Sequence, residues 1–195
     1  MNHLPLILAS ASPRRRELLA TLGIAPQVVP SDATELHGEY LTAREVCMIN
    51  ACRKGAVVAC KHPEQLVLAA DTLVHLGTRL FGKPADGAEA RQMLRDLSGQ
   101  THCVVTAVSL RCRSAGFRMT FAEMTSVTFR KLDEAQIEEY LSQVHTLDKA
   151  GGYAIQEQGD LIIEGIEGSY SNVVGLPLEA LQVVLKSGDV PVFCH

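Results

Sequence analysis

The apolar run at residues 65–70, Gln-Leu-Val-Leu-Ala-Ala, restricts the fold of this chain more than any other stretch. A strand without polar alternation is covered on both faces, as in a sheet that lies between layers of helices. The run ends in Asp71, and a buried carboxylate is costly unless a cation or hydrogen-bond donors compensate it. Two explanations of Asp71 stay open: a functional group in a cleft, or a strand-end residue that accepts bonds from nearby backbone N–H groups.

A second strand, at residues 6–9, leads through small residues into a helix. Ser12 is a favourable N-cap, and Pro13 suits the first helical position. The arginines at residues 14–16 lie in the first turn, where the helix dipole disfavours cations. A bound phosphate would reverse this effect, because backbone N–H groups, serine hydroxyls and guanidinium groups converge there. The alternative is that the arginines extend into solvent or pair with local carboxylates such as Glu17.

The rest of the chain alternates helices and strands. Capping patterns predict helix starts at Thr42, Asp86 and Asp133. Strand-forming residues predict a long hairpin of residues 102–110 and 119–130 and a short strand at residues 161–163. We find no repeat and no linker-like change of composition, so the sequence predicts an α/β protein with one domain over residues 1–195.

The charge and the cysteines exclude several classes of protein. A net charge of −4 gives no general attraction to nucleic acid, and no apolar run reaches the length of a membrane span, about 20 residues. Residues 1–5 lack the basic start and apolar core of a signal peptide, so we expect a cytoplasmic protein. Without zinc-like spacing, the six cysteines are expected to be reduced and to hold no structural zinc. They are Cys47, Cys52, Cys60, Cys103, Cys112 and Cys194.

Several polar residues are not needed by a hydrophobic core. They are Ser10, Ser12, Arg14, Arg15, Arg16, Glu35, Lys54, Asp71 and Lys83. Basic residues for phosphate oxygens together with acidic residues for Mg²⁺ are typical of reactions on nucleoside polyphosphates. The alternative for Lys54, at the border of the apolar face of its helix, is a solvated side chain. The sequence has no Walker A motif and no G-x-S-x-G motif, so it predicts neither a P-loop NTPase nor a common serine hydrolase.

Six segments, in order, resemble motifs of the Maf family of nucleoside triphosphate pyrophosphatases. They are residues 8–15 (LASASPRR), 70–72 (ADT), 82–84 (GKP), 97–102 (LSGQTH), 148–156 (DKAGGYAIQ) and 168–177 (GSYSNVVGLP). The resemblance implies an inosine-triphosphatase-like fold: an elongated mixed sheet flanked by helices, with two lobes and a cleft. It also implies hydrolysis of a nucleoside triphosphate to the monophosphate and pyrophosphate, and a role in clearing non-standard nucleotides.

The resemblance also assigns roles to residues of this chain. It makes Asp71 the base that activates water and, with Glu35, a ligand of Mg²⁺ or Mn²⁺. The residues that it places at the triphosphate are the catalytic cations Lys54 and Lys83 together with Arg14, Arg15, Ser10 and Ser12. The family usually has an Asp-Glu pair where this chain has Thr34 and Glu35, and Asp32 is the candidate substitute for the missing aspartate.

Three residues, Arg14, Thr72 and Gln156, resemble the branch of the family that acts on dTTP and UTP. A glutamine offers an acceptor and two donors, which suits the O4 and N3–H edge of a pyrimidine. The alternative for Gln156 is a loop amide that bonds to the backbone. An alternative for the whole protein is a nucleotide-sensing, division-regulating binding protein without meaningful turnover. The oligomeric state stays open, a homodimer included.

Overall fold

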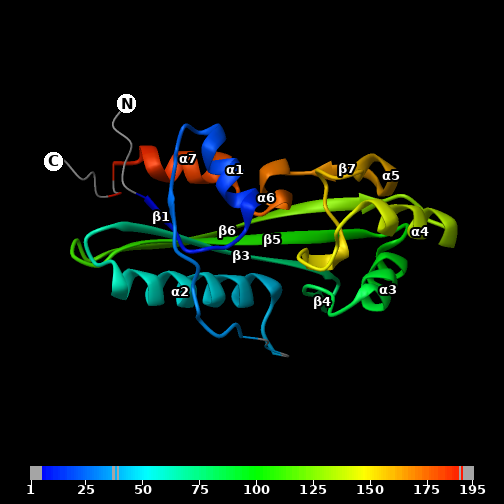
Figure 1. Cartoon of the computed structure of the whole chain (residues 1–195), viewed down its shortest axis with the longest axis horizontal. Helices are drawn as coiled ribbons and strands as arrows, with labels where there is room; N and C mark the ends of the chain where they lie inside the picture. The colour runs from blue at the N-terminus through cyan, green and yellow to red at the C-terminus, as the bar shows by residue number, and fades with distance from the viewer. Residues whose placement is uncertain (1–5, 37, 39, 189, 191–195) are drawn as a thin grey trace.

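The computed structural model describes residues 6–36, 38, 40–188 and 190. Within them, seven strands form one sheet in the order β2-β1-β3-β5-β6-β7, with β4 also paired to β3 (Figure 1). The strands are β1 (Leu6–Leu8), β2 (Gln27–Val28), β3 (Leu66–Leu76), β4 (Arg79–Phe81), β5 (Thr101–Cys112), β6 (Phe117–Phe129) and β7 (Ile163–Glu167). The helices are α1 (Pro13–Thr21), α2 (Ala43–Lys61), α3 (Gly87–Leu97), α4 (Glu134–Gln143), the 3₁₀ turn η1 (Ala150–Gly152), α5 (Gly159–Ile162), α6 (Tyr170–Val174) and α7 (Leu178–Lys186).

The sheet is mixed and elongated, as predicted. β1 runs parallel to β2 and β3, whereas the pairs β3–β5, β5–β6 and β6–β7 are antiparallel. The hairpin of β5 and β6 pairs continuously from Thr101 with Thr128 to Cys112 with Phe117, so both ends of the molecule are built on it (Figure 1). Helices cover the sheet on both faces, which confirms the predicted α/β class.

The side chains of β3 alternate between two helical layers. Leu66 and Leu68 pack in a buried cluster with residues of α1 and α7, and Val67 and Ala69 pack against α2. Figure 1 shows α2 on one side of the sheet and α1, α6 and α7 on the other. Because side chains of a strand alternate with a period of two, the neighbouring residues Asp71 and Thr72, further along β3, also point to opposite faces.

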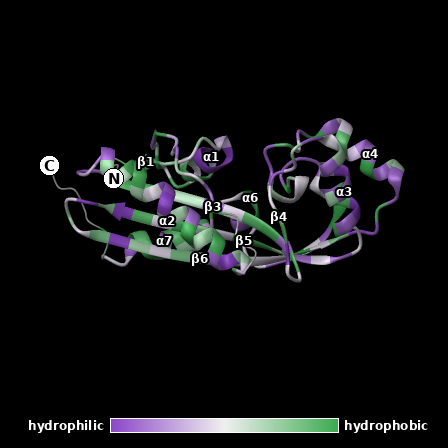
Figure 2. Ribbon diagram, turned by 90° about the horizontal axis from the view of Figure 1, so that it is seen from below, coloured by the Kyte–Doolittle hydropathy of each residue, from purple (hydrophilic) through white to green (hydrophobic). Residues whose placement is uncertain are grey.

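The far end of the sheet forms a second lobe with α3 and α4. Its buried cluster is separate from the clusters under α1 and α2. The inward face of α3 has the spacing of an amphipathic helix, and Ala90, Met93, Leu94 and Leu97 are buried there. Figure 2 shows α3 and α4 set apart from α1 along the sheet, as the expected two-lobed arrangement requires.

The two lobes meet where the edge of β3 has a gap. β1 pairs with Leu66–Leu68 of β3, and β4 pairs with Val74–Leu76. Between these segments, residues 69–73 pair with β5 on one side and with no strand of the described residues on the other. Asp71 and Thr72 therefore lie on an open edge, where one ligand can reach side chains from both faces of the sheet.

The local helix predictions are mostly confirmed. Thr42 and Asp133 form complete capping boxes at α2 and α4. At α3, Asp86 accepts a bond from the Glu89 N–H, but the Glu89 carboxylate bonds to the N–H of Ala85 instead of closing the box. The predicted strand at residues 161–163 is wrong, because its first two residues end α5 and β7 begins only at the third.

None of the described helices is both long enough and apolar enough to cross a membrane. The five described cysteines are free, and Cys47 and Cys112 among them are buried. Cys194 and residues 1–5, on which two of the expectations rest, lie outside the described residues.

Candidate active site

A cleft of about 1110 Å³ opens at the gap between β1 and β4. Its walls come from the turn before α1, the loop before α2, α2 itself, the middle of β3 and the segment around η1. The structure brings together on this cleft most of the residues that the sequence analysis assigns to the site. They are Ser10, Ser12, Arg14, Arg15, Glu35, Lys54, Asp71, Thr72, Lys83 and Gln156.

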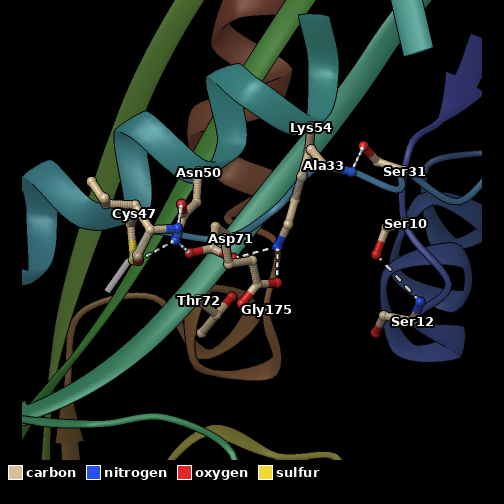
Figure 3. Close-up of polar contacts among 12 residues, drawn as sticks. Ser10, Ser12, Ser31, Ala33, Cys47, Asn50, Lys54, Asp71, Thr72 and Gly175 are labelled. Carbon is tan, nitrogen blue, oxygen red and sulfur yellow. Dashed lines mark hydrogen bonds and ion pairs between the residues drawn. The ribbon is translucent and has the colours of Figure 1, made fainter. Parts of the chain in front are cut away.

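Lys54 lies between two carboxylates on the α2 face of the sheet. Its ammonium nitrogen is 2.6 Å from Asp71 Oδ1 and 2.7 Å from Glu35 Oε1. Figure 3 shows the lysine side chain extending from α2 to Asp71. The Asp71 side chain is 9% exposed, so the ammonium compensates a carboxylate that would be costly to bury alone. Lys54 is thus directed into the cleft instead of into bulk solvent.

Asn50, one helical turn before Lys54, is a site residue that the sequence analysis missed. Its Nδ2 donates to Asp71 Oδ2 at 3.2 Å and to the Leu36 carbonyl at 3.2 Å, and its Oδ1 accepts from the Leu36 N–H at 2.7 Å. Asn50 therefore fixes Asp71 and also the loop that carries Glu35. The signal that could have found it is the spacing of four residues from Lys54, which places both polar side chains on the sheet-facing side of α2.

Arg15 occupies the opposite face of β3. Its Nε donates to the Gly175 carbonyl at 2.9 Å, its Nη1 to Ser10 Oγ at 3.0 Å and its Nη2 to Thr72 Oγ1 at 3.0 Å. These bonds join the turn before α1, β3 and the residue after α6. Burial lowers the pKa of Arg15, while the charge of Asp71 acts in the opposite direction. The three described acceptors are all neutral oxygens.

The Thr72 hydroxyl is part of a chain of hydrogen bonds. Thr106 Oγ1 donates to the Asn172 carbonyl at 3.0 Å, so its single proton is used there. The 3.0 Å contact between Thr72 Oγ1 and Thr106 Oγ1 is then donated by Thr72. Because Thr72 accepts from Arg15 and donates to Thr106, its hydroxyl positions Arg15 and keeps only acceptor capacity for a ligand.

The segment around η1 forms the wall of the cleft opposite α2. Arg14 Nη1 donates to Asp148 Oδ2 at 2.9 Å, which ties the start of α1 to this segment. Burial alone would raise the pKa of Asp148, but Lys149 and Arg14 bring it below its ordinary value. Lys83 and Gln156 are exposed on the cleft wall. Asp148 and Lys149 are functional candidates that the sequence analysis did not single out, although both lie in its 148–156 motif.

Two expectations about charged residues are corrected. Asp32 pairs with Lys61 at 3.3 Å, its side chain is 72% exposed, and it does not line the cleft, so it does not replace the missing acidic neighbour of Glu35. Arg16 lies outside the cleft and lines a separate shallow hollow with Ala20 and Ile24. The reason is helical geometry: successive residues of α1 differ by about 100° in direction, so three consecutive arginines cannot all face one ligand.

The donor set in the cleft fits a hard divalent cation. Asp71 and Glu35 place two carboxylates at one point, and Lys54 now occupies the position between them. The described residues contain no group of three or more His, Cys, Asp and Glu residues that would form a cage for a metal. Mg²⁺ commonly uses one or two carboxylates and completes its shell with water and substrate phosphates, which matches this pair.

Comparison with known proteins gives a consistent result. The family described as Maf-like protein matches residues 5–188. A dTTP/UTP pyrophosphatase of Akkermansia muciniphila is 47% identical over 93% of this chain and 95% of its own length. One of Bacillus cytotoxicus with the same name is 44% identical over 94% and 95%. The structure of the Staphylococcus aureus Ham1 protein superimposes with a TM-score of 0.54 over 94% of this chain and 99% of that chain, at 14% identity, which shows a shared fold.

Proposed function

The chain belongs to the Maf family, and from this membership and the geometry of the cleft we propose that it hydrolyses dTTP and UTP to the monophosphate and pyrophosphate. The relatives of 44–47% identity that bear the name dTTP/UTP pyrophosphatase support this substrate class. The observation that carries the proposal is the convergence of two carboxylates, the buried Asp71 and Glu35, and several cations on one open edge of β3.

In this proposal Asp71 is the base. It accepts the proton of the water that attacks the α phosphorus. The bond from this phosphorus to the oxygen that bridges the α and β phosphates breaks, and pyrophosphate leaves. Asn50 and Lys54 orient the carboxylate through both of its oxygens. Lys54, Lys83 and the first turn of α1 stabilise the negative charge that develops on phosphate oxygens. The neutral oxygens around Arg15 leave its charge available to the same ligand.

We propose Mg²⁺ or Mn²⁺ as the cofactor, held by Asp71 and Glu35. When bound, such an ion neutralises phosphate oxygens and lowers the pKa of a coordinated water. Lys54 must then exchange part of its contact with the two carboxylates for phosphate oxygens. We also propose that the reaction takes place in the cytoplasm, where it would remove non-standard nucleotides before they are used.

We propose that Gln156 selects the base. Its side chain is exposed on the cleft wall, and the described residues give it no side-chain hydrogen bond. An amide in this position can offer a donor to O4 and an acceptor to N3–H of uracil or thymine. A loop amide that only served the backbone would be bonded there already.

The test is a panel of nucleoside triphosphates with Mg²⁺, with Mn²⁺ and with chelator, and with products separated by chromatography. We expect monophosphate and pyrophosphate from dTTP and UTP, and no turnover with chelator. Release of orthophosphate and a diphosphate would overturn the position of cleavage. Tight binding without turnover of any nucleotide would show a nucleotide sensor instead.

A further inference from the structure

Lys149 is a buried cation that lines the cleft. Its side chain is 5% exposed. The ammonium donates to the carbonyl of His145, lies 2.9 Å from Asp148 Oδ1 and lies 3.2 Å from Glu157 Oε1. A buried ammonium is costly unless each of its protons has an acceptor, and here three acceptors are present. None of the steps above uses this lysine.

The partners of Lys149 adjoin the residues proposed to recognise the two ends of a nucleotide. Asp148 binds Arg14 at the start of α1, on the phosphate side. Glu157 directly follows Gln156, on the base side. A single ammonium therefore connects both ends of the 148–157 segment.

Within this segment, backbone hydrogen bonds to other elements reach only as far as Ala154, and after it Ile155 packs against the buried cluster under α1 and α7. Gly151 N–H donates to the Gly82 carbonyl at 2.9 Å. The Tyr140 hydroxyl donates to the Ala154 carbonyl at 3.2 Å and accepts from its N–H at 2.9 Å. Beyond Ala154, the chain turns sharply, and Gln158 has the left-handed φ of 54°. Among the described residues 155–158, the ion pair of Glu157 with Lys149 is the only side-chain ion pair or hydrogen bond.

We propose that Lys149 is a positioning residue that sets base selection, because its bond to Glu157 fixes the direction in which Gln156 faces the cleft. This inference rests on the proposed function of the cleft and adds to it the residue that controls specificity. Lys149 does not touch the base. It limits where the Gln156 amide can lie, and a polar contact that is displaced by about 1 Å loses most of its value.

The test compares dTTP with dCTP, which have the same sugar and ring size and differ at the edge that an amide would recognise. Both nucleotides compete in one reaction, so the product ratio gives the ratio of kcat/KM directly. We expect Lys149→Met and Glu157→Ala each to reduce the preference for dTTP about tenfold, the value of one hydrogen bond. The two variants change the charge near the cleft in opposite directions, so an effect of charge on all triphosphates cannot produce the same change in both.

A background variant separates positioning from general damage. If Lys149 acts through Gln156, Lys149→Met changes the dTTP/dCTP ratio no further in a Gln156→Ala protein, because the two effects are not additive. Glu134→Ala removes an exposed carboxylate whose partner is Arg95, in the lobe of α3 and α4, and is expected to leave the ratio unchanged. Glu157, with 44% of its side chain exposed, keeps the test valid if Lys149→Met fails to fold.

The outcomes distinguish this inference from the proposed function. Hydrolysis with an unchanged dTTP/dCTP ratio in Lys149→Met and Glu157→Ala overturns the role of Lys149 and leaves the pyrophosphatase proposal intact. Additive effects in the Gln156→Ala background also overturn it. If the wild-type protein hydrolyses neither nucleotide, the proposed function fails, and the ratio of dissociation constants for dTTP and dCTP then tests Lys149 by the same criteria.

Discussion

On one face of β3, Asp71 shares the ammonium of Lys54 with Glu35, whereas on the other face Thr72 accepts a hydrogen bond from Arg15. The first cluster has two carboxylates for one cation. In the second, the described hydrogen bonds of the guanidinium all go to neutral oxygens. Asp71 and Thr72, which are adjacent in sequence, thus lie in two different parts of one cleft, an acidic half and a basic half.

The difference shows how one strand can present opposite charges to one ligand while the two charged clusters do not pair with each other. Alternation sends neighbouring side chains to opposite faces, and the sheet keeps the two clusters apart. The gap in the edge of β3 then gives a ligand access to both. A metal-bound triphosphate needs such a site, with carboxylates for the cation and positive charge for the phosphate oxygens.

Loss of the Asp71 carboxylate, in the acidic half of the cleft, is expected to reduce activity most. Asp71→Asn keeps the shape of the side chain but cannot accept a proton, so we expect kcat to fall about 10²–10⁴-fold, while thermal unfolding shows a folded protein. Asp86→Asn is the matched control, because asparagine caps a helix as well as aspartate does and Asp86 caps α3 away from the cleft. If Asp71→Asn keeps more than a tenth of the activity, Asp71 is not the base.

The next prediction concerns the basic half, where a substitution of Arg15 removes hydrogen bonds but keeps the positive charge. Arg15→Lys keeps a cation but cannot reach the acceptors on Ser10, Thr72 and Gly175 together. We expect kcat/KM to fall about 10²-fold, by the same factor for every nucleotide, since phosphate contacts do not distinguish bases. Arg16→Lys, one residue further and outside the cleft, is expected to behave as wild type. Losses that differ between bases would contradict this role.

The third prediction concerns base recognition by Gln156, which belongs neither to the cluster of Asp71 nor to the cluster of Arg15. Gln156→Glu replaces two donors by a charged acceptor, which repels a pyrimidine O4 and costs about 1–3 kcal/mol. We expect kcat/KM to fall for dTTP and UTP and to fall less for GTP. Gln158→Glu makes the same change of charge two residues away and serves as the control. Equal losses for all bases would show that Gln156 does not select the base.

Weaker effects are expected from substitutions that identify the second acidic residue of the acidic half. Glu35→Gln removes a proposed metal ligand, so we expect about tenfold more Mg²⁺ to be needed for half-maximal activity, at a fixed nucleotide concentration. Asp32→Asn weakens an exposed ion pair with Lys61, which solvent screens, and is expected to leave the Mg²⁺ dependence unchanged. The reverse order of effects would show Asp32, instead of Glu35, to be the second acidic group.

Local sequence patterns and the family motifs predicted most of the elements and many residues of the cleft, but not Asn50. The apolar run before Asp71 predicted a strand covered on both faces, and the side-chain caps of Thr42, Asp86 and Asp133 lie at the starts of α2, α3 and α4. These signals are local. The period of two of a strand, the period of 3.6 of a helix and a capping side chain can each be recognised from residues that are close in the sequence. The ordered motifs, similarly, resembled a family and so supplied the residues of the site.

The partners of those residues depend on contacts between elements that are distant in the sequence. Nothing local distinguishes Asp32 from Glu35, or Arg15 from Arg16, since each pair has like charge and lies in one short segment. The packing of α2 on β3 joins Lys54 to Asp71, and the position of the 148–157 segment joins Lys149 to Glu157. Such contacts follow from how layers of side chains fit together, and the direction of each side chain is set by burial that is completed only when the whole chain has folded.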